Sequence, residues 1–268
     1  MVAQPRIMGI VNVTPDSFSD GGRWLDPAAA VAHGLELIEQ GAAIVDVGGE
    51  STRPGAEPVA AAEERRRVVP VIEGLVAAGV AATISIDTSK LEVARAALDA
   101  GATFVNDVTA LRASPGLAEL VAERGAECCL THMQGEPRTM QDAPSYGDVV
   151  AEVIAFLAER VEFAQRAGIA RERIAIDPGI GFGKTVEHNL TLLARLDELS
   201  VIGVPIMIGT SRKSFLGRIT GRGEDERLAA TVATNVLAML AGATLFRVHD
   251  VAAVRDALAV TAATVRQR

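Results

Sequence analysis

One recurring pattern constrains this chain most: a short apolar run followed by a longer stretch rich in Ala, Leu, Glu and Arg. The apolar runs are eight, namely Ile7–Val11, Ala43–Val47, Thr83–Ile86, Phe104–Val105, Cys128–Thr131, Ile174–Ile176, Pro205–Ile208 and Leu245–Val248. Continuous apolar runs, in contrast to alternating ones, are typical of parallel strands that are buried on both faces. Together with a final helix over Ala252–Val265, the repeat predicts an α/β protein with a (β/α)8 TIM-barrel fold.

The length of 268 residues suits such a barrel, built as a single domain over residues 1–268. No linker or low-complexity segment interrupts the chain. A glycine stands where each of several expected helices would stop before the next strand, as helix C-caps commonly do. These glycines are Gly41, Gly79, Gly101, Gly125, Gly168 and Gly242. An open doubly wound sheet stays as the alternative, although it usually has fewer strands at this length.

Polar residues follow the predicted strands at the points where the strands end. In a TIM barrel these points meet at the C-terminal mouth, where the active sites of this fold lie. In chain order they are Asn12, the stretch DVGGESTRPG, Asp87, Asn106-Asp107, His132-Met133, Asp177, GTSRK and RVHD. Carboxylates at such half-buried points cost free energy unless hydrogen-bond donors pair with them. We therefore expect a binding site at this mouth.

The side chains expected there are of two kinds. Asp87, Asn106 and Asp177 offer acceptors in a confined place, and a carboxylate accepts two N–H groups of a heterocycle as it does those of a guanidinium. The cationic side chains are Arg53, Arg212, Lys213, Arg247 and His249. Because phosphate sites of this fold frequently follow strands seven and eight, the sequence predicts a heterocycle pocket beside an anion pocket.

The stretch DPGIGFGKT, residues 177–185, has the glycines of a phosphate-binding loop but not their spacing. The P-loop pattern requires glycine where Pro178 stands, and proline has no N–H to donate to a phosphate. The dinucleotide pattern G-x-G-x-x-G also fails, because Lys184 occupies the place of its third glycine. The stretch therefore indicates a strand that ends at Asp177 and is followed by a tight turn.

Charge and cysteine usage exclude several classes of partner. The net charge of −8 argues against nucleic acid or an acidic membrane as partner, while clustered cations still permit an anionic small substrate. Cys128 and Cys129 are adjacent in an apolar run, which predicts buried thiols without a disulfide framework or metal-ligand spacing. With no cleavable signal sequence and no uncharged run long enough to span a bilayer, the expected location is cytoplasmic.

Eight motifs taken together resemble dihydropteroate synthase, a pterin-binding TIM-barrel family. They are NVTPDSFSDGG, GGESTRPG, SIDTSK, VNDV, THMQGEPRTMQ, DPGIGFGKT, GTSRKSFLG and RVHDV. They stand in the order of that family, at predicted strand ends, and cover nearly the whole chain. The loop TALRASPG after the fourth strand departs from the family in having less glycine.

The resemblance implies an enzyme of folate biosynthesis that joins 4-aminobenzoate to 6-hydroxymethyl-7,8-dihydropterin diphosphate, giving 7,8-dihydropteroate and pyrophosphate. It implies Mg2+ as cofactor, sensitivity to sulfonamides, and a homodimer formed through barrel helices. It also implies an SN1-like mechanism with Mg2+-assisted departure of pyrophosphate from a CH2 group conjugated to the ring. The amine of aminobenzoate is already nucleophilic, so the reaction requires no activated Ser or Cys.

The resemblance further implies a role for each matching position. The pterin would be bound by Asp87, Asn106, Asp177 and Lys213. Pyrophosphate would be bound by Asn12, Arg247 and His249, with Mg2+ on Asn12. Aminobenzoate would be bound by Phe18, Thr52, Arg53, Pro54, Phe182 and Ser211. The catalytic residues would be Asp87, Asp20, Lys213 and Arg247, with Phe18 and Asp20 in a first loop that closes over the site.

Three other classes of protein remain as alternatives. A pterin-binding methyltransferase domain would have less use for STRPG and SRKSFLG, which are both present. A pterin-binding paralogue without turnover would lack an anion or Mg2+ residue, whereas Asn12, Arg247 and His249 are present. Another phosphate-substrate barrel, such as an isomerase of amino-acid biosynthesis, would need an acid/base pair that the strand ends do not show.

Overall fold

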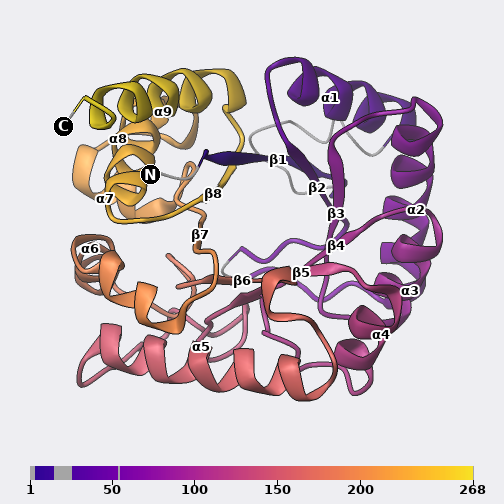
Figure 1. Ribbon diagram of the computed structural model, residues 1–268, viewed down its shortest axis with the longest axis horizontal. Helices are drawn as coiled ribbons and strands as arrows, with labels where there is room; N and C mark the ends of the chain where they lie inside the picture. The colour runs from indigo at the N-terminus through magenta and orange to yellow at the C-terminus, as the bar shows by residue number, and fades with distance from the viewer. Residues whose placement is uncertain (1–3, 15–25, 54, 268) are drawn as a thin grey trace.

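The computed structural model describes residues 4–14, 26–53 and 55–267. Its strands lie in the middle of the molecule, and its helices form a ring around them (Figure 1). The strands are β1 Arg6–Asn12, β2 Ile44–Gly48, β3 Thr83–Asp87, β4 Phe104–Asp107, β5 Glu127–Thr131, β6 Ile174–Asp177, β7 Met207–Ile208 and β8 Leu245–Val248. Each of them overlaps one of the predicted apolar runs, and the polar strand-end residues Asn12, Asp87 and Asp177 are the last residues of their strands.

The strands form one parallel sheet that curves into a barrel. Their order is β6-β5-β4-β3-β2-β1-β8-β7, so neighbours in sequence are neighbours in the sheet. The two ends of this order meet, because Ile176 and Ile206 form a parallel bridge and the Ile176 N–H donates to the Pro205 carbonyl at 2.9 Å. The predicted TIM-barrel fold is therefore confirmed, as a nearly closed barrel of eight parallel strands.

The helices connect the strands on the outside of the barrel. They are α1 Pro27–Glu39, α2 Ala61–Ala77, α3 Leu91–Asp99, α4 Leu117–Arg124, α5 Val149–Arg166, α6 Val186–Ala194, α7 Ser214–Thr220, α8 Leu228–Leu240 and α9 Val251–Val265, with short 3-10 turns at Arg171–Arg173, Leu196–Ile202 and Glu224–Glu226. Two helices rather than one precede β8, because Gly221 ends α7 in a left-handed conformation with φ of 72°. Among the described residues, no helix has the length and apolar character that a membrane span requires.

The core has two layers because consecutive strand residues point to opposite faces of the sheet. A small cluster fills the barrel interior, and it consists of Met8, Ile44, Phe104, Cys129, Ala175, Met207 and Leu245. A larger cluster packs the outer face of the strands against the helices and includes Cys128. Both thiols are free and buried, as predicted.

The same alternation builds the site. Two residues beyond Ile44, Phe104, Ala175 and Leu245 stand Asp46, Asn106, Asp177 and Arg247. Because the side-chain period of a strand is two, these polar residues point into the barrel one layer closer to its mouth. The apolar interior cluster is thus the floor on which a polar layer rests.

Candidate active site

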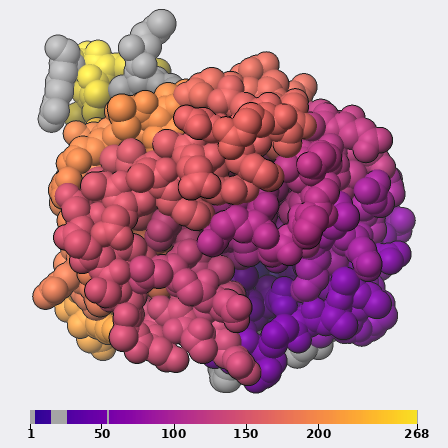
Figure 2. All heavy atoms as spheres, turned by 90° about the horizontal axis from the view of Figure 1, so that it is seen from below, coloured from indigo at the N-terminus to yellow at the C-terminus, as the bar shows by residue number. Residues whose placement is uncertain are grey.

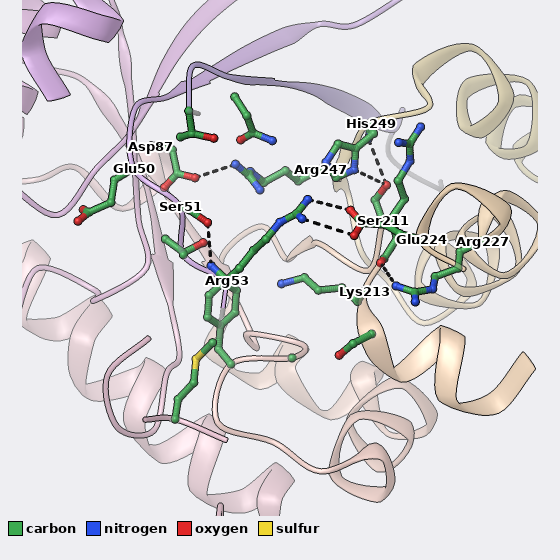
Figure 3. A pocket seen from close by; sticks show the side chains of 18 residues that line it. Glu50, Ser51, Arg53, Asp87, Ser211, Lys213, Glu224, Arg227, Arg247 and His249 are labelled. Atoms are coloured by element: carbon green, nitrogen blue, oxygen red, sulfur yellow. Dashed lines mark hydrogen bonds and ion pairs between the residues drawn. The ribbon is translucent and has the colours of Figure 1, made fainter. Parts of the chain in front are cut away.

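Two adjoining cavities lie at the mouth of the barrel. The larger measures about 350 Å³ and the smaller about 60 Å³. The smaller cavity reaches Ile10 and Met207 of the barrel interior, while the larger is lined by residues at the strand ends and beyond them (Figure 3). In the space-filling view, the surface is hollowed where indigo and purple atoms of the N-terminal part meet pink atoms of the middle of the chain (Figure 2).

The smaller cavity brings together the residues predicted to bind a heterocycle, which are Asp87, Asn106, Asp177 and Lys213. Asp177 is 5% exposed, and its Oδ1 accepts a hydrogen bond from the Gly179 N–H at 2.6 Å. Burial raises the pKa of Asp177, and this hydrogen bond together with Lys213 opposes the rise. A buried carboxylate held in this way has lone pairs left for a ligand with N–H donors.

The larger cavity brings together the residues predicted for the anion and for aminobenzoate, which are Asn12, Thr52, Arg53, Phe182, Ser211, Arg247 and His249. Thr52, Phe182, Ser211, Arg247 and His249 line the smaller cavity as well, so the two cavities share a wall. The predicted residues Phe18, Asp20 and Pro54 lie outside the described residues. The structure therefore places every predicted site residue that it describes at one mouth.

Arg247 stands between two carboxylates. Its Nε donates to Asp46 Oδ2 at 2.6 Å, and its Nη2 donates to Asp87 Oδ2 at 2.7 Å (Figure 3 shows the second contact). Burial disfavours the charge of Arg247, but Asp46 and Asp87 hold its pKa above the ordinary value. Burial raises the pKa of Asp87, and Arg247 opposes that rise. The guanidinium is thus fixed in direction and retains N–H groups for an anion.

His249 is held by Ser211. The Ser211 Oγ accepts the His249 backbone N–H at 3.2 Å and lies 3.0 Å from His249 Nδ1 (Figure 3). Burial, followed by the nearby Arg212 and Arg247, lowers the pKa of His249 well below its ordinary value. The lowered pKa favours a neutral His249 ring, in contrast to the cationic side chain that the sequence led us to expect. A neutral ring that accepts a hydrogen bond from the Ser211 hydroxyl at Nδ1 would carry its own proton at Nε2, where it would serve as a donor.

Two further pairs shape the larger cavity. The Lys213 Nζ lies 4.0 Å from the centroid of the Phe182 ring, a cation–π contact. Burial lowers the pKa of Lys213 to about 8, although Asp177 favours its charge. Arg53 donates to both carboxylate oxygens of Glu224, at 2.8 and 3.4 Å, so it crosses the cavity (Figure 3).

Comparison with known proteins agrees with this arrangement. A family model described as pterin binding enzyme matches residues 8–249. The dihydropteroate synthase of Escherichia coli is 48% identical over 264 residues, which cover 98% of this chain and 93% of that protein. The chain belongs to the dihydropteroate synthase family.

Solved structures of dihydropteroate synthases have the same fold. The Yersinia pestis enzyme, in complex with a sulfonamide drug, has a TM-score of 0.95 and 42% identity, covering 99% of this chain and 96% of the other. The Xanthomonas albilineans enzyme, in complex with 7,8-dihydropteroate, has a TM-score of 0.88 and 51% identity, covering 99% of this chain and 95% of the other. The resemblance inferred from the motifs is thereby confirmed, and this protein is an enzyme of that family.

Asp46, Lys184 and Glu224 contact residues of this dihydropteroate synthase site and were not among the predicted ones. Asp46 did carry a signal, because it is a carboxylate inside the apolar run Ala43–Val47. Lys184 is 3% exposed, and its Nζ lies 2.9 Å from His132 Nδ1 and donates to the Phe182 carbonyl at 3.0 Å. Glu224 lies in a polar stretch between helices, and nothing local distinguishes it from its acidic neighbours Asp225 and Glu226.

Asn12 is the residue that the family resemblance assigns to Mg2+. No cluster of three or more His, Cys, Asp or Glu side chains suited to a metal occurs in the described part of the chain. Mg2+ usually keeps several waters and takes one or two protein oxygens together with phosphate oxygens. The amide oxygen of Asn12, in the wall of the cavity that also contains Arg247 and His249, fits this way of binding.

Proposed function

We propose that this protein transfers the pterinylmethyl group of 6-hydroxymethyl-7,8-dihydropterin diphosphate to 4-aminobenzoate, releasing pyrophosphate and giving 7,8-dihydropteroate. The observation that carries the proposal is the pair of adjoining cavities. One presents acceptors from Asp177 and Asn106 suited to a heterocycle, and the other presents the donors of Arg247 and His249 suited to an anion. The 7,8-dihydropteroate in the Xanthomonas albilineans relative supports the same chemistry here.

The pterin would lie in the smaller cavity. Its N3–H and 2-amino group form an edge of two donors, and Asp177 would accept both while the Gly179 N–H holds the carboxylate in place. Lys213 would donate to the acceptors of the ring. A site that hydrogen-bonds a substrate edge in this way rejects analogues lacking that edge by about 10⁴–10⁵.

The diphosphate would extend into the larger cavity. The C–O bond between the pterin methylene and the diphosphate would break first, with its electron pair leaving on pyrophosphate. The charge that develops on the leaving group would be offset by Arg247 and by the Nε2–H of His249. Mg2+, held by Asn12 together with phosphate oxygens, would supply further positive charge there. Asp87 has the charge sign that stabilises the cation-like methylene, and Asp20 is proposed to share this role.

Aminobenzoate would then attack the methylene with its amine nitrogen, which afterwards loses a proton. Arg53 and Ser211 would hold its carboxylate, while Thr52, Phe182 and, outside the described residues, Phe18 and Pro54 would enclose its ring. In this structure the Glu224 carboxylate accepts the Arg53 hydrogen bonds that the substrate carboxylate would accept. Because sulfonamides resemble aminobenzoate in shape, the complex of the Yersinia pestis relative supports sulfonamide inhibition of this protein too.

The test is pyrophosphate release from the dihydropterin diphosphate with Mg2+, measured with and without 4-aminobenzoate. Release that depends on aminobenzoate, with an equal amount of dihydropteroate, is the expected result. Tight pterin binding without turnover would instead indicate a binding paralogue. Absence of any pterin binding would reject the assignment of the smaller cavity.

We also propose a homodimer formed through the outer helices. Leu237 and Leu240 lie three residues apart on α8 and are 56% and 55% exposed, and Val260 of the neighbouring α9 is 68% exposed. Residues three apart lie on one face of a helix, and an exposed apolar patch of this kind is typical of an interface. Sedimentation of the wild type and of Leu237→Glu would test this, with a dimer expected only for the wild type. The cytoplasmic location stays a prediction.

A further inference from the structure

Asp46 lies in the middle of β2 and is fully buried. Its carboxylate accepts three hydrogen bonds, one from each of three other strands. The Ser85 Oγ donates to Oδ1 at 2.6 Å, whereas Oδ2 accepts the Asn106 Nδ2 at 3.0 Å and the Arg247 Nε at 2.6 Å. A single carboxylate beneath the cavities therefore holds one residue of the heterocycle pocket and one of the anion pocket.

The contact with Asp46 decides which way the Asn106 amide points. A carboxylate that receives three donors offers only acceptors, so the amide nitrogen of Asn106 must face it. The amide oxygen then points the other way. That Oδ1 atom is buried and has no hydrogen-bond partner among the described residues, although Asn106 lines the smaller cavity. A buried acceptor without a partner costs free energy until a donor reaches it.

Arg247 donates to Asp46 Oδ2, the oxygen that also accepts from Asn106, and its second hydrogen bond goes to Asp87. One group therefore orients both the guanidinium, which lies in the wall that the two cavities share, and the amide, which lies in the wall of the smaller cavity. Neither the catalytic motifs nor the family comparison assigns a role to Asp46, whose side chain lines neither cavity.

We propose that Asp46 is a positioning residue that determines specificity. It turns the Asn106 amide so that Oδ1 accepts an N–H of the substrate heterocycle, and it selects heterocycles that present a donor there. The inference rests on the proposed function, because the heterocycle is the pterin of that proposal. Without Asp46, the amide is free to rotate and to present its NH2 group, which repels a donor edge.

The experiment measures the Kd of 6-hydroxymethylpterin by calorimetry for the wild type, Asp46→Asn, Asn106→Ala and the double variant. Loss of a hydrogen bond to a buried group predicts a Kd raised roughly ten- to a hundredfold in Asp46→Asn. If Asp46 acts through Asn106, the double variant binds no more weakly than Asn106→Ala alone, within about threefold. Losses that multiply in the double variant would overturn the inference, since a merely structural role of Asp46 predicts that result.

The matched control is Asp107→Asn. Asp107 is a fully buried carboxylate next to Asn106 in β4, but it accepts from Thr109 and Leu111 and lines neither cavity. The pterin Kd of Asp107→Asn should stay within about twofold of the wild-type value, because this variant leaves the hydrogen bond between Asn106 and Asp46 unchanged. A loss equal to that of Asp46→Asn would mean that any buried carboxylate at this mouth has the same effect, which overturns the inference.

The exchange variant Asp46→Asn/Asn106→Asp keeps the inference testable if Asp46→Asn folds poorly. It exchanges donor and acceptor across the pair, so that the carboxylate now on β4 keeps an oxygen toward the cavity while the amide now on β2 donates to it. Arg247 then loses its hydrogen bond to residue 46 and keeps the one to Asp87. Pterin affinity should recover relative to Asp46→Asn, and failure to recover would contradict the inference. If the wild type binds pterin but the losses of affinity in Asp46→Asn and Asn106→Ala multiply in the double variant, only this inference fails. If the wild type binds no pterin, the proposed function fails as well.

Discussion

At the scale of single residues, the site depends on buried charges that are each held by a defined partner. Arg247 contacts Asp46 and Asp87, and Asp177 accepts the Gly179 N–H. Burying an ionised group is costly unless hydrogen bonds and an opposite charge compensate for it. The substrate therefore meets groups whose orientation is set before it arrives, which is the arrangement that favours binding and catalysis.

The substitution Asp177→Asn should weaken pterin binding by about ten- to a hundredfold, as expected for hydrogen bonds to a charged group. If the new amide oxygen faces the Gly179 N–H, its NH2 group meets the N–H edge of the pterin. If the amide is reversed, its NH2 group meets the Gly179 N–H instead. Calorimetry with 6-hydroxymethylpterin checks this, and unchanged affinity would refute the assignment of Asp177.

Arg53 and Glu224 should have opposite effects on aminobenzoate. Arg53→Ala should raise the KM for aminobenzoate about tenfold, because a charge-assisted hydrogen bond is lost. Glu224→Gln should lower it by about two- to fivefold, since a half-exposed ion pair no longer competes for the guanidinium. The KM for the pterin diphosphate serves as the control and should hardly change. An increase in the aminobenzoate KM of Glu224→Gln would mean that Glu224 holds Arg53 in its working position.

At the scale of elements, the loop between β6 and α6 is the most constrained part of the site. Gly179 has φ of 69°, and a Cβ there would lie 1.8 Å from the His132 carbonyl oxygen. Gly221, at the end of α7, has a similar φ of 72°, but a Cβ there would meet nothing within 4 Å. The two glycines thus share the backbone requirement and differ in the space around them.

This difference predicts unequal costs for Gly→Ala substitutions. Gly221→Ala should lower the free energy of unfolding by about 1–2 kcal/mol, the cost of a left-handed alanine. Gly179→Ala should cost about 1–3 kcal/mol more, because of steric overlap with the His132 carbonyl after β5. It should also weaken pterin binding, since the Gly179 N–H holds Asp177. Urea unfolding measures both variants, and equal destabilisation would show that the loop adjusts to the added methyl group.

At the scale of the whole molecule, Lys184 joins the loops that follow β5 and β6. Its Nζ lies 2.9 Å from His132 Nδ1, and burial lowers its pKa to about 7. An unfolded lysine titrates near 10.4. Between these two values the unfolded chain binds one proton more than the folded chain, so the contribution of Lys184 to stability increases with pH.

The expected result is that the free energy of unfolding of the wild type, relative to Lys184→Met, rises by about 2 kcal/mol from about pH 7 to pH 9. Urea unfolding at both pH values measures it. Lys90→Met is the control: burial disfavours the charge of Lys90, but Glu50 and Glu64 raise its pKa above the ordinary value. Both states of Lys90 keep the proton over this range, so the titration of Lys90 itself adds no slope to that difference. A flat difference for Lys184 would mean that its ammonium remains charged in the folded protein.

The sequence by itself determined the barrel and most of the site. Eight apolar runs specify eight buried parallel strands, and the chain leaves each strand at the same mouth, so Asn12, Asp87, Asn106, Asp177 and Arg247 had to converge. The number of strands and the position of the strand-end residues both depend on which residues follow one another along the chain. The hydrophobic pattern and the motif spacing show this directly.

Only the tertiary structure decided which groups pair and which protonation states follow. The contact between Arg53 and Glu224 joins residues 171 positions apart, and that between Arg247 and Asp46 joins residues 201 positions apart. The lowered pKa of His249 follows from its burial beside Arg212 and Arg247, which local sequence does not reveal. Desolvation and the distances between charges set these properties, and both arise only when strands and loops from the whole chain meet at the barrel mouth.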